Sequence, residues 1–346
     1  MNGRGVIRAA LTVVACVACV ATPGRSAERH LVRRGFQAMG TEISFAVLSD
    51  DDEGASRAID AGFAEIKRLE NLMTTWRDDS EVSRINQQAG VAPVTVSPET
   101  LEVIEAAQHA SKISGGVFDI TFYAMRGLWK FDEDLEAKLP PAAEIKKRLA
   151  LIDYRKLVVD HDKRTVFLTR KGMAINLGGI AKGYAVDRAV ALLRQAGYHD
   201  AIVQAGGDLM CSGSKNGAPW VTGIRDPRGE RSDVFAKMML TNHAFSTAGD
   251  YERYYILGGK RYHHIIDPRT GYPATRSRSV TIYAPTALTA DAVDDAVFIL
   301  GWQKGFEMID KLDDVGAVVV DDKGQVHVSK RVQDRVHIDY QPRDAP

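Results

Sequence analysis

The densest group of reactive side chains lies in residues 261–273, which read RYHHIIDPRTGYP. Two imidazoles, a carboxylate, two guanidinium groups and two phenols occur there within thirteen residues. An imidazole can exchange protons near neutral pH. Ile265 and Ile266 interrupt the polar run as a short buried strand would, so we expect the flanking polar groups to have fixed directions. A surface hairpin with a Pro-Gly turn is the alternative interpretation.

A second group is acidic and lies in residues 289–295, which read TADAVDD. Asp291 and Asp295 are four residues apart and therefore share one face of a helix, with Asp294 beside them. Like charges at that spacing repel unless a cation lies between them, and carboxylate oxygens suit a hard cation such as Mg²⁺ or Ca²⁺. The alternative is that these acids merely interact favourably with the positive end of the helix dipole.

Three further motifs combine glycine with polar residues. The stretch 176–184 (NLGGIAKGY) opens a predicted helix, where the helix N-terminus and Lys182 would favour an anion. It lacks the spacing of a P-loop, and an ordinary strand-to-helix turn explains it equally well. The stretch 204–208 (QAGGD) ends on a carboxylate, and 245–251 (FSTAGDY) is rich in hydroxyl groups.

Helices and strands alternate irregularly along the chain, as the positions of apolar residues show. This order differs from the strict βαβ alternation of a doubly wound sheet. We therefore predict an α+β fold with mixed, largely antiparallel sheets and packed helices. Strands are predicted at 41–48, 157–159, 165–168, 201–204, 234–240 and 279–283, helices at 50–72, 97–115, 179–196 and 289–300, and a last hairpin around 321–324.

Residues 1–27 are predicted to be a signal peptide. Arg4 and Arg8 precede an apolar run over 9–21, which is shorter than the roughly 20 residues of a membrane-spanning helix. Cys16 and Cys19 each follow small apolar residues, as in a bacterial lipobox, so we expect a periplasmic protein with a lipid anchor on the inner membrane. Ordinary cleavage near position 21 or 27 would instead leave a soluble exported protein.

Residues 28–346 are expected to form a single domain, because about 320 residues can enclose one substantial core. Lys plus Arg and Asp plus Glu both number 45, and no long basic block occurs, which argues against nucleic acid as the main partner. After removal of the signal peptide only Cys211 remains, so no internal disulfide is available. We expect Cys211 to be a packed residue and not a nucleophile.

Taken in order along the chain, these motifs resemble those of the ApbE-type FAD:protein FMN transferases. The resemblance extends from about Gly35 to Val328. Each landmark is weak alone, but their shared order is specific. The landmarks are residues 38–41, 73–86, 115–119, 176–187, 204–208, 246–251, 264–271 and the helix that carries Asp291.

The resemblance implies a reaction on FAD with a divalent metal, usually Mg²⁺. The FMN half is transferred to a threonine or serine hydroxyl of an exported domain of a membrane redox protein, and AMP leaves. Such phosphoryl transfer depends on positioning and charge neutralisation. An FAD pyrophosphatase, with water as the acceptor, and a non-catalytic periplasmic FAD-binding protein would use the same pocket, and both stay open as alternatives.

The resemblance also assigns residues. His264 matches the proposed catalytic base, and Gly179, through its carbonyl, and Asp291 match metal ligands. Many relatives have threonine where this chain has Asp295, preceded by Asp294, and the extra carboxylates would either strengthen the metal site or disturb it. The positions that match FAD contacts are Met39, Trp76, Val117, Phe118, Asp119, Asn176, Lys182 and Ile266.

Overall fold

The computed structural model describes residues 28–131 and 138–344. The predicted signal peptide, with Cys16 and Cys19, lies outside these residues and stays a prediction. Within the described part of the chain, the helices are all too short or too polar to cross a bilayer.

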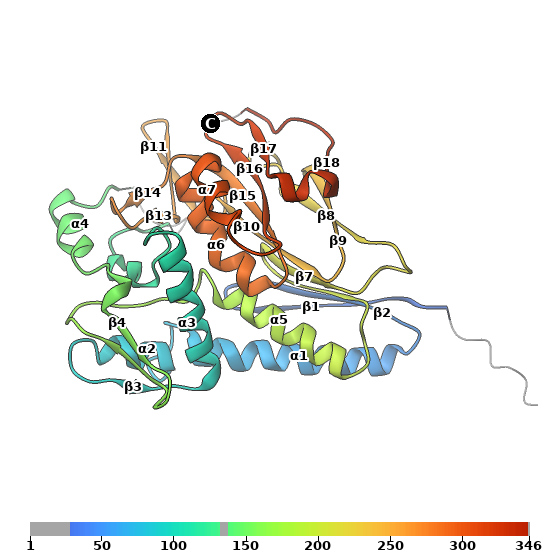
Figure 1. Ribbon diagram of the computed structural model, residues 1–346, viewed down its shortest axis with the longest axis horizontal. Coiled ribbons are helices and arrows are strands. Elements are labelled where there is room, and N and C mark those ends of the chain that lie inside the picture. The colour runs from blue at the N-terminus through green and yellow to red at the C-terminus, as the bar shows by residue number, and fades with distance from the viewer. Residues whose placement is uncertain (1–27, 132–137, 345–346) are drawn as a thin grey trace, which may run out of the picture.

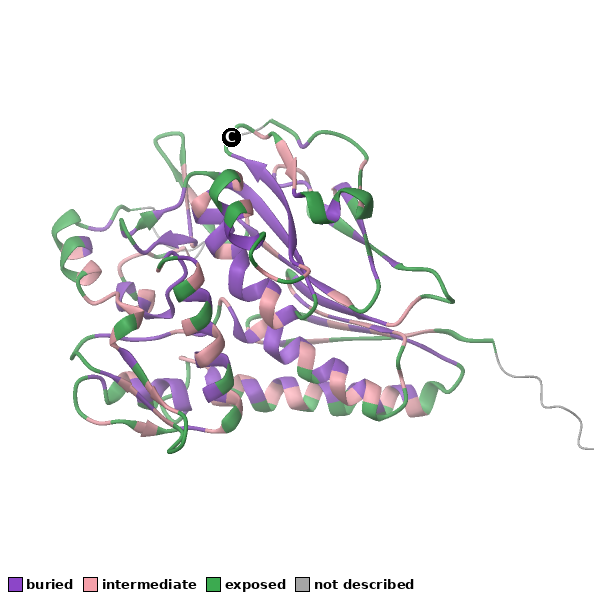
Figure 2. Ribbon diagram, viewed as in Figure 1, coloured by how far each residue is buried: buried purple, intermediate pink, exposed green. Residues whose placement is uncertain are grey.

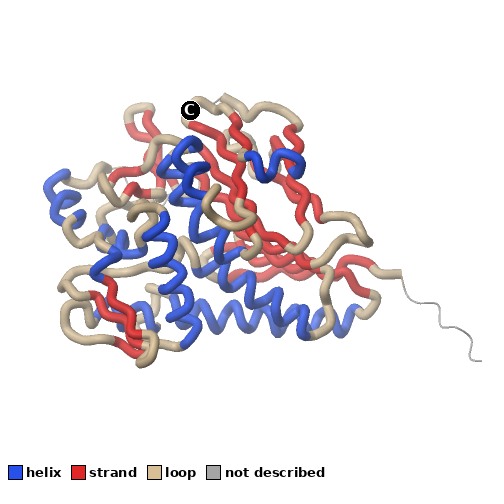
Figure 3. The backbone as a smooth tube through the Cα atoms, in the orientation of Figure 1, coloured by secondary structure: helices blue, strands red, loops and turns tan. Residues whose placement is uncertain are grey.

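An eight-stranded sheet forms the centre of the molecule, and every neighbouring pair in it is antiparallel (Figure 1, Figure 3). Turns join several sequence neighbours directly, as antiparallel pairing allows. In spatial order its strands are β1 (His30–Ala38), β2 (Thr41–Ser49), β6 (Ala201–Ala205), β7 (Asp208–Ser212), β10 (His243–Gly249), β15 (Ser277–Ala284), β16 (Gly316–Asp321) and β17 (Val326–Val328).

Helices cover one face of this sheet. Ile43, Phe45 and Val47 alternate along β2 and are buried in a large apolar core that the helices share. Figure 2 shows α6 buried along most of its length, whereas the outer side of α1 is exposed. The helices are α1 (Asp52–Met73), α2 (Glu81–Gln87), α3 (Pro98–Ile113), α4 (Ala142–Leu149), α5 (Ala181–Gln195), α6 (Ala287–Leu300) and α7 (Trp302–Ile309).

A second apolar core lies on the opposite face. A three-stranded sheet, β8 (Trp220–Arg225), β9 (Val234–Leu240) and β18 (Val336–Ile338), packs there against Leu209 and Phe245 of the central sheet. Because side chains alternate along a strand, Asp208, which precedes Leu209, and Ser246, which follows Phe245, lie on the helix-covered face. Cys211 is buried in this second core, and burial raises the pKa of its thiol, as expected for a packed residue.

Smaller elements lie beside the two main layers. Among the described residues these are a three-stranded sheet, two two-stranded hairpins and three short 3₁₀ helices. These elements are β3 (Val94–Thr95), β4 (Leu157–Asp160), β5 (Thr165–Leu168), β11 (Tyr254–Leu257), β12 (Lys260–His263), β13 (Ile266–Asp267), β14 (Tyr272–Pro273), η1 (Ile120–Met125), η2 (Tyr154–Lys156) and η3 (Lys330–Arg335).

The predicted α+β class with largely antiparallel sheets is confirmed. The prediction for residues 261–273 needs two corrections. Only Ile266 belongs to a strand, because β13 begins there and Ile265 precedes it. The stretch does contain a hairpin, β13–β14, with a turn from Pro268 to Gly271. Its turn residues Arg269 and Thr270 are exposed, whereas its strand residues Ile266, Asp267 and Pro273 are buried, so the hairpin lies only partly at the surface.

Candidate functional site

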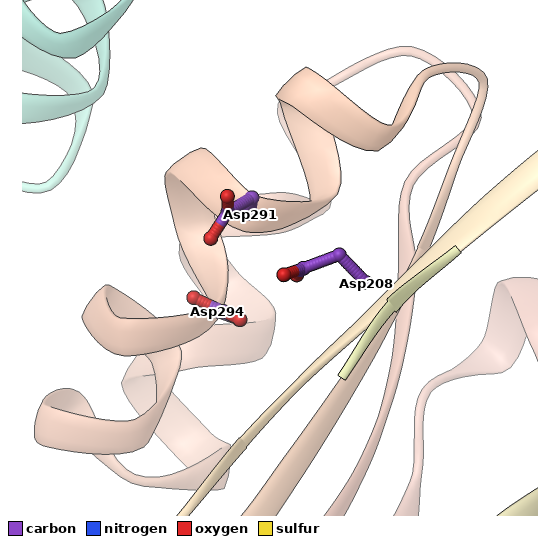
Figure 4. A group of neighbouring side chains, drawn as sticks. All are labelled: Asp208, Asp291 and Asp294. Carbon is purple, nitrogen blue, oxygen red and sulfur yellow. The ribbon is translucent and has the colours of Figure 1, made fainter. Parts of the chain in front are cut away.

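Three buried carboxylates meet between β7 and α6. Asp208 extends from β7 towards Asp291 and Asp294 of α6, and the three side chains point at one another (Figure 4). One oxygen from each lies within 4.8 Å of the others. All three side chains are almost fully enclosed by protein. Buried carboxylates without compensating positive charge are costly, so this grouping calls for a cation.

Local structure explains the meeting. Gly207 lets the chain enter β7 close to β10, because a Cβ there would lie 2.7 Å from the carbonyl oxygen of Thr247. Asp291 and Asp294 are three residues apart on α6 and therefore share a face. The helix begins at Ala287, so Asp291 lies beyond its first turn. The alternative interpretation, that Asp291 only interacts with the helix dipole, is therefore wrong.

Lys182 and Gly183, at the start of α5, contact the acidic group. The Lys182 Nζ lies 2.6 Å from Asp208 Oδ2 and 3.3 Å from Asp291 Oδ1. The amide of Gly183 donates a hydrogen bond of 2.9 Å to Asp291 Oδ2. The sequence predicted an anion at this helix N-terminus, and the anion found there is the protein's own Asp291.

Ser246 of β10 lies between two of the acids. Its hydroxyl is within hydrogen-bond distance of Asp208 Oδ1 and, at 2.5 Å, of Asp294 Oδ2. A serine hydroxyl has one proton and donates to one acceptor at a time. When no further cation is bound, a proton on Asp294 would let the second contact also be a hydrogen bond.

The pKa values of the acids agree with that conclusion. Burial, together with repulsion from Asp208, raises the pKa of Asp291 to about 7. Burial and the neighbouring Asp295 raise the pKa of Asp294 well above its usual range. Burial alone would lower the pKa of Lys182, but the carboxylates of Asp208 and Asp291 raise it instead.

The site fits a hard divalent cation, because its donors are carboxylate oxygens that hold more negative charge than Lys182 can balance. Asp295 is only half-buried and lies outside the three-carboxylate group. Its Oδ2 is 3.3 Å from where a Cβ of Gly179 would be, so these two predicted metal ligands are neighbours. The sequence missed Asp208 as a candidate ligand, although its place after Gly206-Gly207 offered a signal. The assignments of metal ligands stay predictions.

His264 follows β12 and is a candidate proton acceptor. Its Nδ1 is buried and has no hydrogen-bond partner among the described residues. Burial, with the neighbouring His263 and Arg253, lowers the pKa of His264 to about 4, so the imidazole is neutral at pH 7. Its backbone amide donates to the carbonyl of Arg253 at 3.1 Å, which fixes the chain at that point.

Two other groups that could exchange protons are held by structural contacts. A ring nitrogen of His263, Nε2, lies 2.8 Å from the carbonyl oxygen of Ala274. Asp250 accepts two hydrogen bonds from Arg228, at 2.7 and 2.8 Å, and both side chains are buried. Asp250 is therefore neutralised by an ion pair and is a poor substitute for His264 as a base.

The predicted flavin contacts Met39, Trp76 and Asn176 lie near one another. Met39 and Gly40 form a two-residue turn with positive φ between β1 and β2. A Cβ on Gly40 would lie 3.0 Å from Trp76 Cη2, so glycine admits the indole, which is itself 74% exposed. The side-chain amide of Asn176 donates a hydrogen bond of 3.2 Å to the hydroxyl oxygen of Thr75, which precedes Trp76. An exposed aromatic ring beside an open turn can stack on a planar ligand.

The other predicted contacts are enclosed. Val117, Phe118 and Ile266 are buried, and Phe118 lies against Gly179. The carboxylate of Asp119 accepts hydrogen bonds from the amide and hydroxyl of Thr121 and from the amide of Tyr154. Its oxygens therefore organise the chain around η1. The FAD contacts of these four residues stay predictions.

Residues 39–319 match the family model described as "ApbE family". The chain belongs to the ApbE family. Among curated relatives, an FAD:protein FMN transferase of Klebsiella pneumoniae is 35% identical over 283 residues, which cover 82% of this chain and 86% of that protein. One from Treponema pallidum is 32% identical over 343 residues and covers 94% of both chains.

Solved structures of ApbE proteins have the same fold as this family member. The ApbE protein of Thermotoga maritima superposes with a TM-score of 0.79 at 34% identity, covering 87% of this chain and 97% of that one. The flavin transferase ApbE of Vibrio cholerae gives a TM-score of 0.76 at 25% identity, covering 89% and 99%. The match covers most of each chain, so the overall fold is shared.

Proposed function

We propose that this ApbE-family chain is an FAD:protein FMN transferase. Curated relatives with that name match this chain over most of its length and over most of their own. The observation that best supports it here is the meeting of the three carboxylates with Lys182 beside a neutral His264. Lys182 adds to the lowering of the His264 pKa, after burial and the charges of His263 and Arg253.

The reaction that these groups support is a phosphoryl-type transfer. The acceptor hydroxyl oxygen bonds to the FMN-side phosphorus of FAD. The bond from that phosphorus to the bridging oxygen breaks, and AMP leaves with the electron pair. The proton of the hydroxyl passes to the neutral imidazole of His264, which acts as general base. Holding the imidazole neutral at pH 7 keeps it ready to accept that proton.

The metal that we propose is Mg²⁺. Asp291, Asp294 and Asp208 would hold it, with Asp295 and the carbonyl of Gly179 at the border of the site. A bound divalent cation supplies positive charge that neutralises a pyrophosphate in such reactions. Lys182 holds the carboxylates together, because it already contacts two of them from one side.

The acceptor that we propose is a threonine or serine on the exported domain of a membrane redox protein.

The location that we propose is the periplasm, with a lipid anchor on Cys16 or Cys19. The apolar run over 9–21 and its small residues before each cysteine support this location. Mass spectrometry of the exported protein's N-terminus tests the anchor. A free amino terminus beyond residue 19 would contradict it.

Product analysis tests the proposed activity. The protein is incubated with FAD, Mg²⁺ and a candidate acceptor domain, and flavin and nucleotide products are separated by chromatography. We expect one AMP for each flavin bound to the acceptor. Free FMN in equal amount with AMP would show an FAD pyrophosphatase. Bound but unconverted FAD would show a flavin-binding protein, whose metal site the extra carboxylate of Asp295 had altered.

A further inference from the structure

Arg253 lies between His264, the candidate base, and the predicted flavin contacts at Met39 and Trp76. Its carbonyl oxygen accepts the hydrogen bond from the amide of His264, which makes the two residues immediate neighbours. Its guanidinium Nη2 is 3.7 Å from the point that a Cβ of Gly40 would occupy. Trp76 lies at 3.0 Å from the same point. Arg253 therefore extends from the candidate base towards the turn and the exposed indole.

The guanidinium of Arg253 is uncommitted. The residue is exposed, and within residues 28–131 and 138–344 its side chain makes no ion pair or hydrogen bond. Other cations near the site are engaged. Lys182 contacts Asp208 and Asp291, and Arg228 makes a bidentate pair with Asp250. A new anion in the space before His264 would find Arg253 available.

A second cation would serve the site. Asp208, Asp291 and Asp294 gather near one lysine, Lys182, and these carboxylates would take up the charge of a bound metal, so the flavin-side phosphate would gain from a positive charge of its own. A guanidinium matches the oxygens of a phosphate with two parallel hydrogen bonds and stays charged at any working pH. Arg253 contacts His264 through its backbone carbonyl, and its guanidinium lies near Gly40 and Trp76.

We propose that Arg253 binds the flavin-side phosphate of FAD and positions it in front of His264. The flavin ring then lies towards Trp76 and the Met39–Gly40 turn, while the rest of the pyrophosphate faces the acidic cluster. This inference rests on the proposed function for the identity of the ligand. It assigns to Arg253 the recognition of phosphate and to Trp76 the recognition of the ring.

A series of three ligands tests this assignment. Riboflavin has no phosphate, FMN has one, and FAD has a pyrophosphate. Dissociation constants are measured by flavin fluorescence quenching for the parent chain, Arg253→Gln, Arg253→Lys and Arg57→Gln, in EDTA and in Mg²⁺. Arg57→Gln is the matched control, because Arg57 is an exposed arginine on α1 that pairs only weakly with Glu53 at 3.7 Å.

We expect Arg253→Gln to weaken FAD and FMN binding about ten- to a hundred-fold, the usual effect of losing a charged hydrogen bond, and to leave riboflavin within about twofold. Arg253→Lys should recover part of the loss, and Arg57→Gln should match the parent. In transfer assays KM for FAD should rise more than kcat falls.

Two results would overturn the assignment. One is FAD affinity in Arg253→Gln within about twofold of the parent. The other is an equal loss for riboflavin, which would show that Arg253 supports the ring or the fold and does not recognise phosphate. A parent chain that binds FAD but transfers no FMN would contradict the proposed function alone, because the ligand series would still measure what Arg253 binds.

Discussion

Burial has opposite consequences for the imidazole and the carboxylates of this site. It lowers the pKa of His264 to about 4, and it raises the pKa of Asp291 to about 7. Both shifts favour the neutral form of the group, since desolvation penalises charge of either sign. A neutral imidazole is ready to accept a proton, whereas protonated acids are poor metal ligands. A divalent cation is the partner that returns the acids to their ionised form.

Replacing His264 separates binding from chemistry. We expect His264→Ala to keep FAD affinity within a few-fold and to lose FMN transfer by roughly a hundred- to ten-thousand-fold, the usual contribution of a positioned general base. Fluorescence quenching measures binding, and the rate of acceptor modification measures transfer. His161→Ala is a suitable control, because His161 is an exposed histidine paired with Glu105. Equal losses of binding and transfer would make His264 a ligand-holding residue.

Asp294 should make the metal-free protein less stable as pH rises. Its pKa is raised above the ordinary 3.8, so the folded state keeps a proton that the unfolded state has released. Its contribution to the free energy of unfolding therefore falls as pH rises from about 4 through the raised pKa. The lowered pKa of His264 acts in the opposite direction, costing stability as pH falls below its ordinary 6.5.

The difference in the free energy of unfolding between the parent and Asp294→Asn removes the contribution of His264, because both proteins contain His264. In EDTA we expect Asp294→Asn to gain stability relative to the parent between pH 5 and 7.5, measured by urea unfolding. Added Mg²⁺ should stabilise the parent more than the variant, because the variant has lost a ligand. Parallel pH profiles in EDTA would show that Asp294 is ionised and satisfied without a metal.

At the scale of elements, α5 and α6 act as one unit. Gly183 of α5 packs so closely on α6 that a Cβ there would lie 2.2 Å from the carbonyl oxygen of Ala287. Asp187, one turn later on α5, accepts hydrogen bonds from the amides of Ala287 and Leu288, at 2.9 and 2.8 Å. These contacts fix the start of α6 and, through it, the position of Asp291.

Gly183→Ala should therefore push the helices apart. We expect a loss of about 1–3 kcal/mol in the free energy of unfolding, typical of overpacking, together with weaker metal binding. Gly35→Ala is the matched control, because nothing lies within 4 Å of a Cβ at Gly35 in β1. Thermal and urea unfolding measure the difference. Equal stability of the two variants would show that α6 can shift without cost.

At the scale of the whole molecule, the spacing of apolar residues predicted most helices and strands but not which of them contact one another. The strand at 41–48, the helix at 97–115 and the hairpin at 157–168 follow from local apolar spacing and capping residues. The acidic site does not, because Asp208 reaches α6 only through the antiparallel order of β6, β7 and β10. Spacing placed Asp291, Asp294 and Asp295 on one helix, whereas only the fold adds Asp208 of β7 to Asp291 and Asp294.

Arg253 illustrates the same limit. Nothing local to the sequence YERYY marks it, and its neighbour Gly40 lies far away in the chain, while His264 lies beyond the β11–β12 hairpin. Its position depends on the turn after β10, which brings the start of β11 beside the end of β12. Family resemblance supplied the candidate contacts at Met39 and Trp76. The fold placed beside them, next to His264, a guanidinium that has no ion pair or hydrogen bond within the described part of the chain.

The central claim is that the buried carboxylates support transfer of FMN to another protein. Intact mass spectrometry of an acceptor domain tests it. The domain is incubated with FAD and one of four preparations: the parent chain in Mg²⁺, the parent chain in EDTA, Asp291→Ala in Mg²⁺ or Asp295→Thr in Mg²⁺. We predict a mass gain of one FMN phosphoester with the parent and Asp295→Thr in Mg²⁺, and almost none in the other two. Full modification by Asp291→Ala in Mg²⁺ or by the parent in EDTA, or an unmodified acceptor beside free FMN with the parent in Mg²⁺, would contradict the account.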